Sequence, residues 1–167
     1  MRKTSPSFIA ACLCAACGWA VAGTATVVFV QPESYTDAGP DRAVPTPRDR
    51  AQVQQELARH LERLAADGLA ADASIAVEVL DIDLAGRLEP VRGGEEMRVI
   101  RDVTGPRIRL RYVLTQGGRV AGAAEERVSD INFLTNWNPY PPADRLRYEK
   151  AMLDGWFARN FGGPPKG

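Results

Sequence analysis

The chain of 167 residues carries 21 lysine and arginine side chains against 21 aspartates and glutamates, with a single histidine. Nucleic-acid binding relies on clustered positive charge, so this even balance gives no support for a nucleic-acid partner. One histidine cannot supply the several ligands of a zinc site. We therefore expect no metal and no cofactor.

The first 22 residues have the pattern of a secretory signal peptide. Arg2 and Lys3 form a positively charged start, an apolar run extends from Phe8 to Trp19, and Ala20-Val21-Ala22 is a small-residue cleavage site. The apolar run is shorter than the about 20 residues that a transmembrane helix needs. The pattern predicts secretion, to the periplasm, with cleavage after Ala22.

All the cysteines (Cys12, Cys14 and Cys17) lie inside this leader. Removing 22 of 167 residues would leave 145 without a thiol, which excludes disulfides, cysteine nucleophiles and thiolate metal sites. The alternative is a lipoprotein that keeps Cys17, and only that form would contact a membrane. The domain expectation is a signal peptide over 1–22, one domain over 23–161, and a disordered glycine- and proline-rich tail over 162–167.

The first half of the domain predicts a strand followed by a helix. Residues 24–30 are rich in β-branched side chains and favour a strand, and 31–44 form a loop. Thr46 can cap a helix in which Asp49 completes a capping box. The helix should end at Gly68, and its buried side chains repeat at helical spacing: Val53, Leu57, Leu61 and Leu64.

The second half predicts strands and a closing helix. Residues 74–84 and 107–115 alternate apolar and polar side chains, and 97–103 is a weaker candidate strand. Gly117-Gly118 predicts a two-residue turn into a strand over 119–128, with Arg109 opposite Glu126 and Tyr112 opposite Ala123. A helix should follow over 143–161.

The order β-α-β-(β)-β-β-α predicts an α+β fold. A single-layer, mainly antiparallel sheet of about four to five strands should carry two helices packed on it. Glu149 falls on the apolar face of the closing helix. Because an unpaired buried charge costs several kcal/mol, Glu149 should bind an arginine or a backbone amide.

Few residues suggest catalysis. His60 lies at the edge of an apolar helix stripe without a nucleophile motif, so we interpret it as a residue at the rim of the core. Asp81 and Asp83 share one side of a strand end and could divide acid and base roles in a carboxylate-dependent hydrolase, with Glu149 as a further candidate. Aspartates at strand ends more often cap turns.

Two further groups are candidate ligand contacts. Arg107, Arg109 and Arg111 form a ladder along one strand that could hold an anionic envelope component, although neighbouring carboxylates could neutralise the ladder instead. The loop segment from Asn136 to Tyr140 combines the rings of Trp137 and Tyr140 with amide side chains. Such a loop suits a ligand surface, yet a lone tryptophan there more often packs at the edge of the core.

Several short segments, taken in order, resemble a family of exported proteobacterial proteins, domain-of-unknown-function family 3016. The similar segments are Val27-Val28-Phe29, Pro32-Glu33, Tyr35-Thr36-Asp37, the run 81–86, Pro106-Arg107-Ile108, Tyr148-Glu149-Lys150 and Trp156-Phe157. The resemblance covers nearly the whole mature chain. It implies a single exported domain and transfers no mechanism, because the family has no assigned activity.

The sequence as a whole predicts an exported, periplasmic and non-catalytic module that binds a component of the cell envelope. The partner is either an anionic envelope component or another envelope protein. The alternatives are the carboxylate-dependent hydrolase and the lipid-anchored envelope lipoprotein. The positions of Asp81 and Asp83 distinguish the binding module from the hydrolase, because a hydrolase needs these side chains in a concave pocket.

Overall fold

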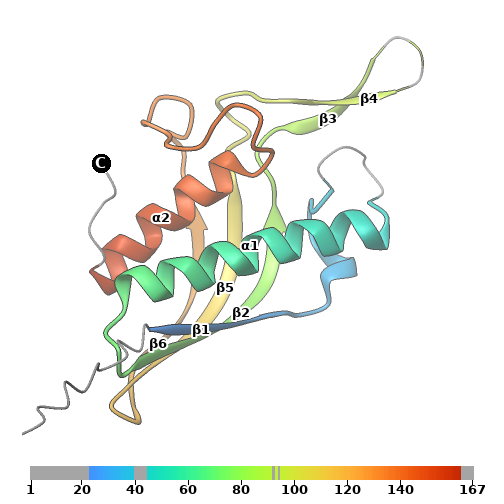
Figure 1. Ribbon diagram of the computed structural model, residues 1–167. Coiled ribbons are helices and arrows are strands. Elements are labelled where there is room, and N and C mark those ends of the chain that lie inside the picture. Colours follow the sequence, from blue (N-terminus) through green and yellow to red (C-terminus); the bar gives the residue numbers. More distant parts are fainter. Residues whose placement is uncertain (1–22, 40–44, 92, 94, 163–167) are drawn as a thin grey trace, which may run out of the picture.

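The structure, a computed structural model, describes residues 23–39, 45–91, 93 and 95–162 (Figure 1). The expected signal peptide with its cysteines, and residues 163–167 of the expected tail, lie outside the described residues. Two α-helices, a sheet of four strands and a separate two-stranded sheet make an α+β fold, as predicted. No helix among the described residues is long and apolar enough to span a membrane.

The first half forms a β-α-β unit. Strand β1 (Thr24–Phe29) leads through the short 3-10 helix η1 (Pro32–Ser34) to α1 (Pro47–Gly68) and then to β2 (Ala73–Asp83), which runs parallel to β1. The predicted capping box is confirmed. Thr46 Oγ1 accepts a hydrogen bond from the Asp49 amide at 3.2 Å, and Asp49 Oδ2 accepts one from the Thr46 amide at 2.9 Å. The helix ends at Gly68, as predicted.

The second half adds antiparallel strands. Strand β5 (Arg107–Gln116) pairs with β2, and β6 (Arg119–Ser129) pairs with β5, so the sheet order is β1-β2-β5-β6. Both helices lie on the same side of this sheet (Figure 1). Ile75, Val77, Ile108 and Leu110 are buried beneath them, while the opposite face of the sheet, here called the open face, is largely exposed.

One bulge in β6 makes the predicted register wrong by one residue. Ala121 is the extra residue, because Thr115 pairs with Val120 and Leu114 with Gly122. Arg109 therefore lies opposite Arg127 rather than Glu126, and Tyr112 lies opposite Ala124 rather than Ala123. A one-residue shift exchanges the two faces of a strand. Glu126 consequently turns toward α2 (Arg147–Phe161), where it accepts a hydrogen bond from Trp156 Nε1 at 2.9 Å.

A second bulge in β2 adjusts the end of that strand. Val79 pairs with Leu110 and Asp81 with Arg109, so Leu80 is the extra residue. This shift keeps Ile82 in the core and places Asp81 and Asp83 on the open face beside the arginines of β5. Without it, the alternation that buries Val77 and Val79 would direct Asp81 into the core.

The weaker candidate strand forms a separate hairpin. Strands β3 (Arg87–Pro90) and β4 (Glu96–Val99) pair only with each other, so the expected strand over 97–103 is shorter and does not join the main sheet. Gly86 starts this hairpin with a φ of 85°. A Cβ atom there would lie 2.7 Å from the Val99 carbonyl oxygen, so the close approach of Gly86 to the end of β4 requires glycine.

The closing helix α2 starts at Arg147, four residues later than predicted, and ends at Phe161. The delay arises in a turn where Asp144 Oδ1 accepts a hydrogen bond from the Leu146 amide at 2.9 Å. Gly162 caps the helix with a φ of 73°. The helix buries a row of side chains on the sheet: Glu149, Met152, Leu153, Trp156 and Phe157.

Candidate ligand groove between the two helices

A groove of about 510 Å³ lies beside the two helices, and residues of α1, α2 and the loop before α2 line it. Its apolar side chains are those of Leu64, Trp137, Pro139, Ala151, Phe157 and Ala158. Five side chains bring charge or hydrogen-bonding groups to it: His60, Arg63, Asp67, Tyr140 and Asp154. A concave, mostly apolar surface with a few convergent polar groups is the usual form of a small-molecule site.

His60 has one tautomer fixed by its neighbours. Its Nε2 lies 3.2 Å from the Lys150 carbonyl oxygen, and Arg63 Nη2 lies 3.0 Å from its Nδ1. A carbonyl only accepts and a guanidinium only donates, so Nε2 carries the hydrogen and Nδ1 accepts. The side chain is buried, with 2% of its surface exposed, which confirms its expected place at the core. Both ring nitrogens are thus already used by the protein.

Asp154 occupies the centre of a polar cluster that it forms with His60 and Tyr140. Its Oδ2 accepts a hydrogen bond of 2.6 Å from the Tyr140 hydroxyl. Its Oδ1 lies 2.9 Å from His60 Nε2, but the N–H is directed at Lys150, and Oδ1 accepts no aligned hydrogen bond among the described residues. The side chain of Asp154 remains 31% exposed. Asp154 therefore borders the groove with the exposed part of its side chain, while its Oδ1 atom is buried beside His60.

Tyr140 connects the loop to this cluster. Its ring meets His60 edge-on, with ring centroids 5.7 Å apart. Burial and the hydrogen bond to Asp154 both raise the pKa of its hydroxyl. The phenol therefore stays protonated and holds its proton toward Asp154.

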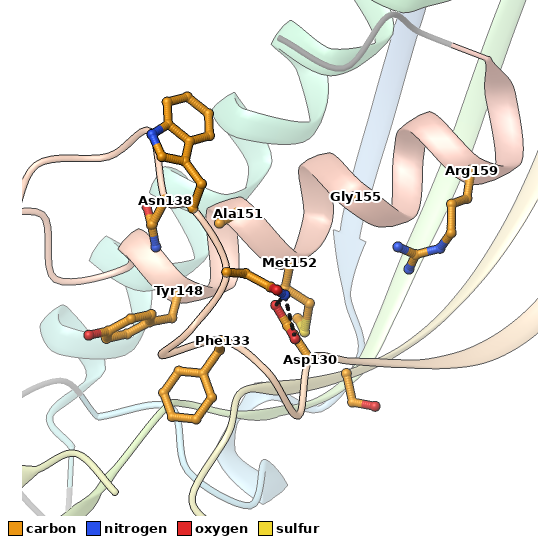
Figure 2. Close-up of a pocket in the computed structure, with 11 residues that line it drawn as sticks. Asp130, Phe133, Asn138, Tyr148, Ala151, Met152, Gly155 and Arg159 are labelled. Atoms are coloured by element: carbon orange, nitrogen blue, oxygen red, sulfur yellow. Dashed lines mark hydrogen bonds between the residues drawn. The ribbon is translucent and has the colours of Figure 1, made fainter. Parts of the chain in front are cut away.

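A smaller hollow of about 200 Å³ adjoins the groove and shares Trp137, Ala151 and Gly155 with it. Figure 2 shows Tyr148, Met152 and Arg159 projecting from α2 around this hollow, with Phe133 and Asp130 contributed by the loop after β6. Asn136 Nδ2 donates to both carboxylate oxygens of Asp130, at 3.2 and 3.1 Å. These bonds hold the loop that presents Trp137.

The described lining of the groove does not contain the nucleophiles that a histidine base usually activates. None of its described lining residues is a serine, threonine or cysteine. His60 has no free nitrogen with which to activate a nucleophile. The arrangement can bind and orient a ligand, but it does not assemble a serine, threonine or cysteine nucleophile with a histidine base.

Of the residues predicted from the sequence, Trp137 and Tyr140 line this groove. Trp137 is 68% exposed, so it does not pack at the edge of the core. The polar cluster itself was not predicted, because His60 and Asp154 lie on different helices. The sequence showed only that Arg63 follows His60 by about one helical turn.

The arginine ladder lies away from the groove, on the open face, where it is paired with carboxylates. Arg107 contacts Asp83 at 3.2 Å, Arg109 contacts Glu125 at 3.4 Å, and Arg111 contacts Glu78 at 2.9 Å and Glu125 at 3.2 Å. Arg127 lies opposite Arg109 on the same face. The arginines of the ladder are therefore paired with carboxylates on the open face, although Arg109 also has Arg127 as its neighbour on β6.

Asp81 and Asp83 bind different partners. Asp81 accepts hydrogen bonds from the Thr36 amide at 2.7 Å and the Thr36 hydroxyl at 2.9 Å. Asp83 pairs with Arg87 at 2.8 Å as well as with Arg107. Neither aspartate lines the groove or the adjoining hollow. Both side chains lie on the open face and are already paired there with different groups.

Glu149 is enclosed between α2 and the end of β2, with 1% of its surface exposed. Its Oε1 accepts a hydrogen bond of 2.7 Å from the Ala85 amide, so the expected backbone partner is confirmed. Its Oε2 has no hydrogen-bond partner among the described residues. Burial raises the pKa of this carboxyl to about 7, although the Ala85 amide opposes the rise.

Comparison with known protein families matches residues 23–159 to the family described as "Protein of unknown function (DUF3016)". No curated protein and no solved structure matches the chain. The match spans the sheet and nearly all of α2, and it confirms the resemblance drawn from the short segments. The chain belongs to the DUF3016 family.

Proposed function

We propose that this protein is an exported, periplasmic and non-catalytic binding module, with the groove between α1 and α2 as its ligand site. The observation that carries the binding role is the combination of an exposed Trp137 and an apolar lining with the His60–Tyr140–Asp154 cluster. Buried, mutually oriented polar groups beside an apolar surface provide both affinity and orientation for a small molecule.

Two observations support export. Residues 1–22 have the charged start, apolar run and small-residue site of a signal peptide. The family match begins at residue 23, directly after the expected cleavage site. The region that the family model matches therefore begins where cleavage after Ala22 would start the mature chain.

Expression of the full-length precursor in a Gram-negative host tests export. Osmotic-shock fractions should contain the protein, and its intact mass should correspond to a chain beginning at Gly23. An Ala20→Arg, Ala22→Arg precursor is the matched control, because large charged residues block the cleavage site. A mature form that carries a lipid on Cys17 would instead support the alternative of a lipid-anchored protein. An uncleaved protein in the cytoplasm would refute export.

Native mass spectrometry of protein purified from the periplasmic fraction tests the binding role. The expected result is a bound small molecule that is lost from a Trp137→Ala, Tyr140→Phe variant. Val120→Ala is the control, since Val120 is 69% exposed and does not line the groove. Equal retention by both variants would exclude the groove as the site.

A further inference from the structure

The two edge strands of the main sheet differ in how they are protected. A free edge presents unpaired backbone N–H and C=O groups, and folded proteins usually shield such an edge with charged side chains, proline or a bulge. Strand β6 has the bulge at Ala121 and the exposed charges of Glu125 and Arg127. Strand β1, at the other edge, contains no charged residue and no proline, and its pairing with β2 is regular. The edge at β1 is therefore the unprotected one.

The outer side of β1 offers a regular row of hydrogen-bonding groups. The Val30 amide donates to the Val79 carbonyl oxygen at 2.9 Å, so the even-numbered residues of this segment direct their backbone groups toward β2. The backbone groups of successive residues in a strand point to opposite sides. Ala25, Val27 and Phe29 therefore direct their N–H and C=O groups away from β2, where no described strand pairs with them (Figure 1).

Both faces of β1 also leave apolar surface accessible. Val27 packs against the core but is only partly buried, whereas its partner on β2, Val77, is 1% exposed. On the open face, Val28 is 51% exposed and Val30 is 37% exposed. A further strand beside β1 would cover part of this surface.

The chemistry of this edge defines its partner. Alternating donors and acceptors at strand spacing are complementary to the backbone of another extended polypeptide. A second copy of this chain fits, because two-fold pairing sets a strand against itself and the uncharged β1 meets no like charge. In the register that overlaps residues 24–30 fully, Thr26 lies opposite Val28 of the second copy. Thr24 then lies opposite Val30, so each of these contacts on the open face joins β-branched side chains.

We propose that the protein forms a two-fold symmetric dimer in which the β1 strands of two copies pair in antiparallel orientation. The two four-stranded sheets become one continuous sheet in the order β6-β5-β2-β1-β1-β2-β5-β6. Both edges of this sheet are then β6 strands, which the bulge and the charges already protect, so the assembly stops at two copies. This inference concerns assembly and does not depend on the ligand groove.

Sedimentation equilibrium of the exported protein over a concentration series tests the dimer. We expect the mass of two chains. Val28→Lys should weaken self-association at least about tenfold, because the two lysines would bring like charges together across the symmetry axis. Val103→Lys is the matched control, since Val103 is 75% exposed in a loop outside the sheet. A single-chain mass at every concentration up to about 0.5 mM, or an unchanged dimer in Val28→Lys, would refute the pairing.

Disulfide cross-linking locates the interface and guards against misfolding of the lysine variant. The mature chain that begins at Gly23 contains no cysteine, so introduced thiols are the only ones. A variant that combines Thr26→Cys with Val28→Cys should form a cross-linked dimer under mild oxidation. Antiparallel pairing brings these positions of the two copies within reach of a disulfide whether the axis passes through either residue or between them.

The matched control combines Ala76→Cys with Glu78→Cys, at the positions that pair with Thr26 and Val28 on β2. In the dimer the two β2 strands lie three strand spacings apart, about 14 Å, which exceeds the limit of about 7 Å for a disulfide. Equal cross-linking of both variants, or of neither in a dimeric protein, would place the interface elsewhere and overturn the proposal. A different polypeptide that copurifies and is released by Val28→Lys would assign the edge to another partner, and would likewise overturn the pairing of two copies.

Discussion

Replacing Glu149 with glutamine should change how the stability of the protein depends on pH. In the folded protein this carboxyl is buried and its pKa is raised from 4.5 to about 7. In the unfolded chain it is solvated and has its ordinary pKa. The folded state therefore holds the proton of Glu149 more tightly than the unfolded state.

The sign and the magnitude follow from this difference. The stabilising effect of the proton is complete below about pH 4.5 and is lost as the pH rises through 7. One pKa unit corresponds to 1.36 kcal/mol, so the shift amounts to roughly 3 kcal/mol of unfolding free energy between pH 4.5 and 8. Glutamine is neutral throughout and can still accept the Ala85 amide bond. Glu149→Gln should therefore gain roughly 3 kcal/mol relative to the original protein over this range.

Urea unfolding at pH 5, 6, 7 and 8 measures the effect, with the fluorescence of the buried Trp156 as the signal. Only the change with pH is diagnostic, because the amide group of glutamine adds a constant offset. Glu62→Gln is the control for removing a glutamate, since Glu62 is exposed on α1. Parallel stability profiles for the Glu149→Gln variant and the original protein would refute a raised pKa for Glu149.

Three other substitutions, one of them with a control at Trp137, test the fold. Gly86→Ala should lower the unfolding free energy by about 1–3 kcal/mol, because of its φ of 85° and the 2.7 Å approach to Val99; an unchanged melting temperature would contradict this geometry. Trp156→Phe removes the hydrogen bond from Nε1 to Glu126 and should lower the unfolding free energy by about 2 kcal/mol. The control Trp137→Phe, at the surface, should lower it by less than about 0.5 kcal/mol. Equal losses of unfolding free energy in urea titrations would argue against this hydrogen bond. Arg111→Ser should cost at most about 1 kcal/mol in thermal unfolding, since its side chain is 52% exposed, and a larger loss would show that the pairs on the open face stabilise the sheet strongly.

Local patterns were enough to predict most elements of the fold. The capping box of Thr46 and Asp49 and the stop at Gly68 placed α1, because helix ends depend on bonds between residues a few positions apart. Alternating side chains placed β2 and β5, and Gly117-Gly118 placed the turn between β5 and β6. These are all short-range interactions, so the sequence contains them directly.

Local patterns did not predict the bulges in β2 and β6 or the separate β3–β4 hairpin. A single extra residue at Ala121 shifts the register of β6, and nothing in the local alternation marks it. The gain from the shift is tertiary, because it brings Glu126 to Trp156 on α2. Likewise β3 and β4 pair only with each other, which the pattern of residues 97–103 did not indicate.

By itself, the sequence determined the α+β fold, the buried faces of its helices and strands, and the need of Glu149 for a partner. It also identified Trp137 and Tyr140 as candidate contacts, because aromatic rings in a polar loop are visible locally. Only the tertiary structure decided that Tyr140 meets His60 and Asp154, that the arginine ladder is paired with carboxylates, and that Asp81 and Asp83 bind separate partners. The physical reason is that a binding site depends on which side chains packing brings together, and here that packing joins α1, α2 and a loop that are distant in sequence.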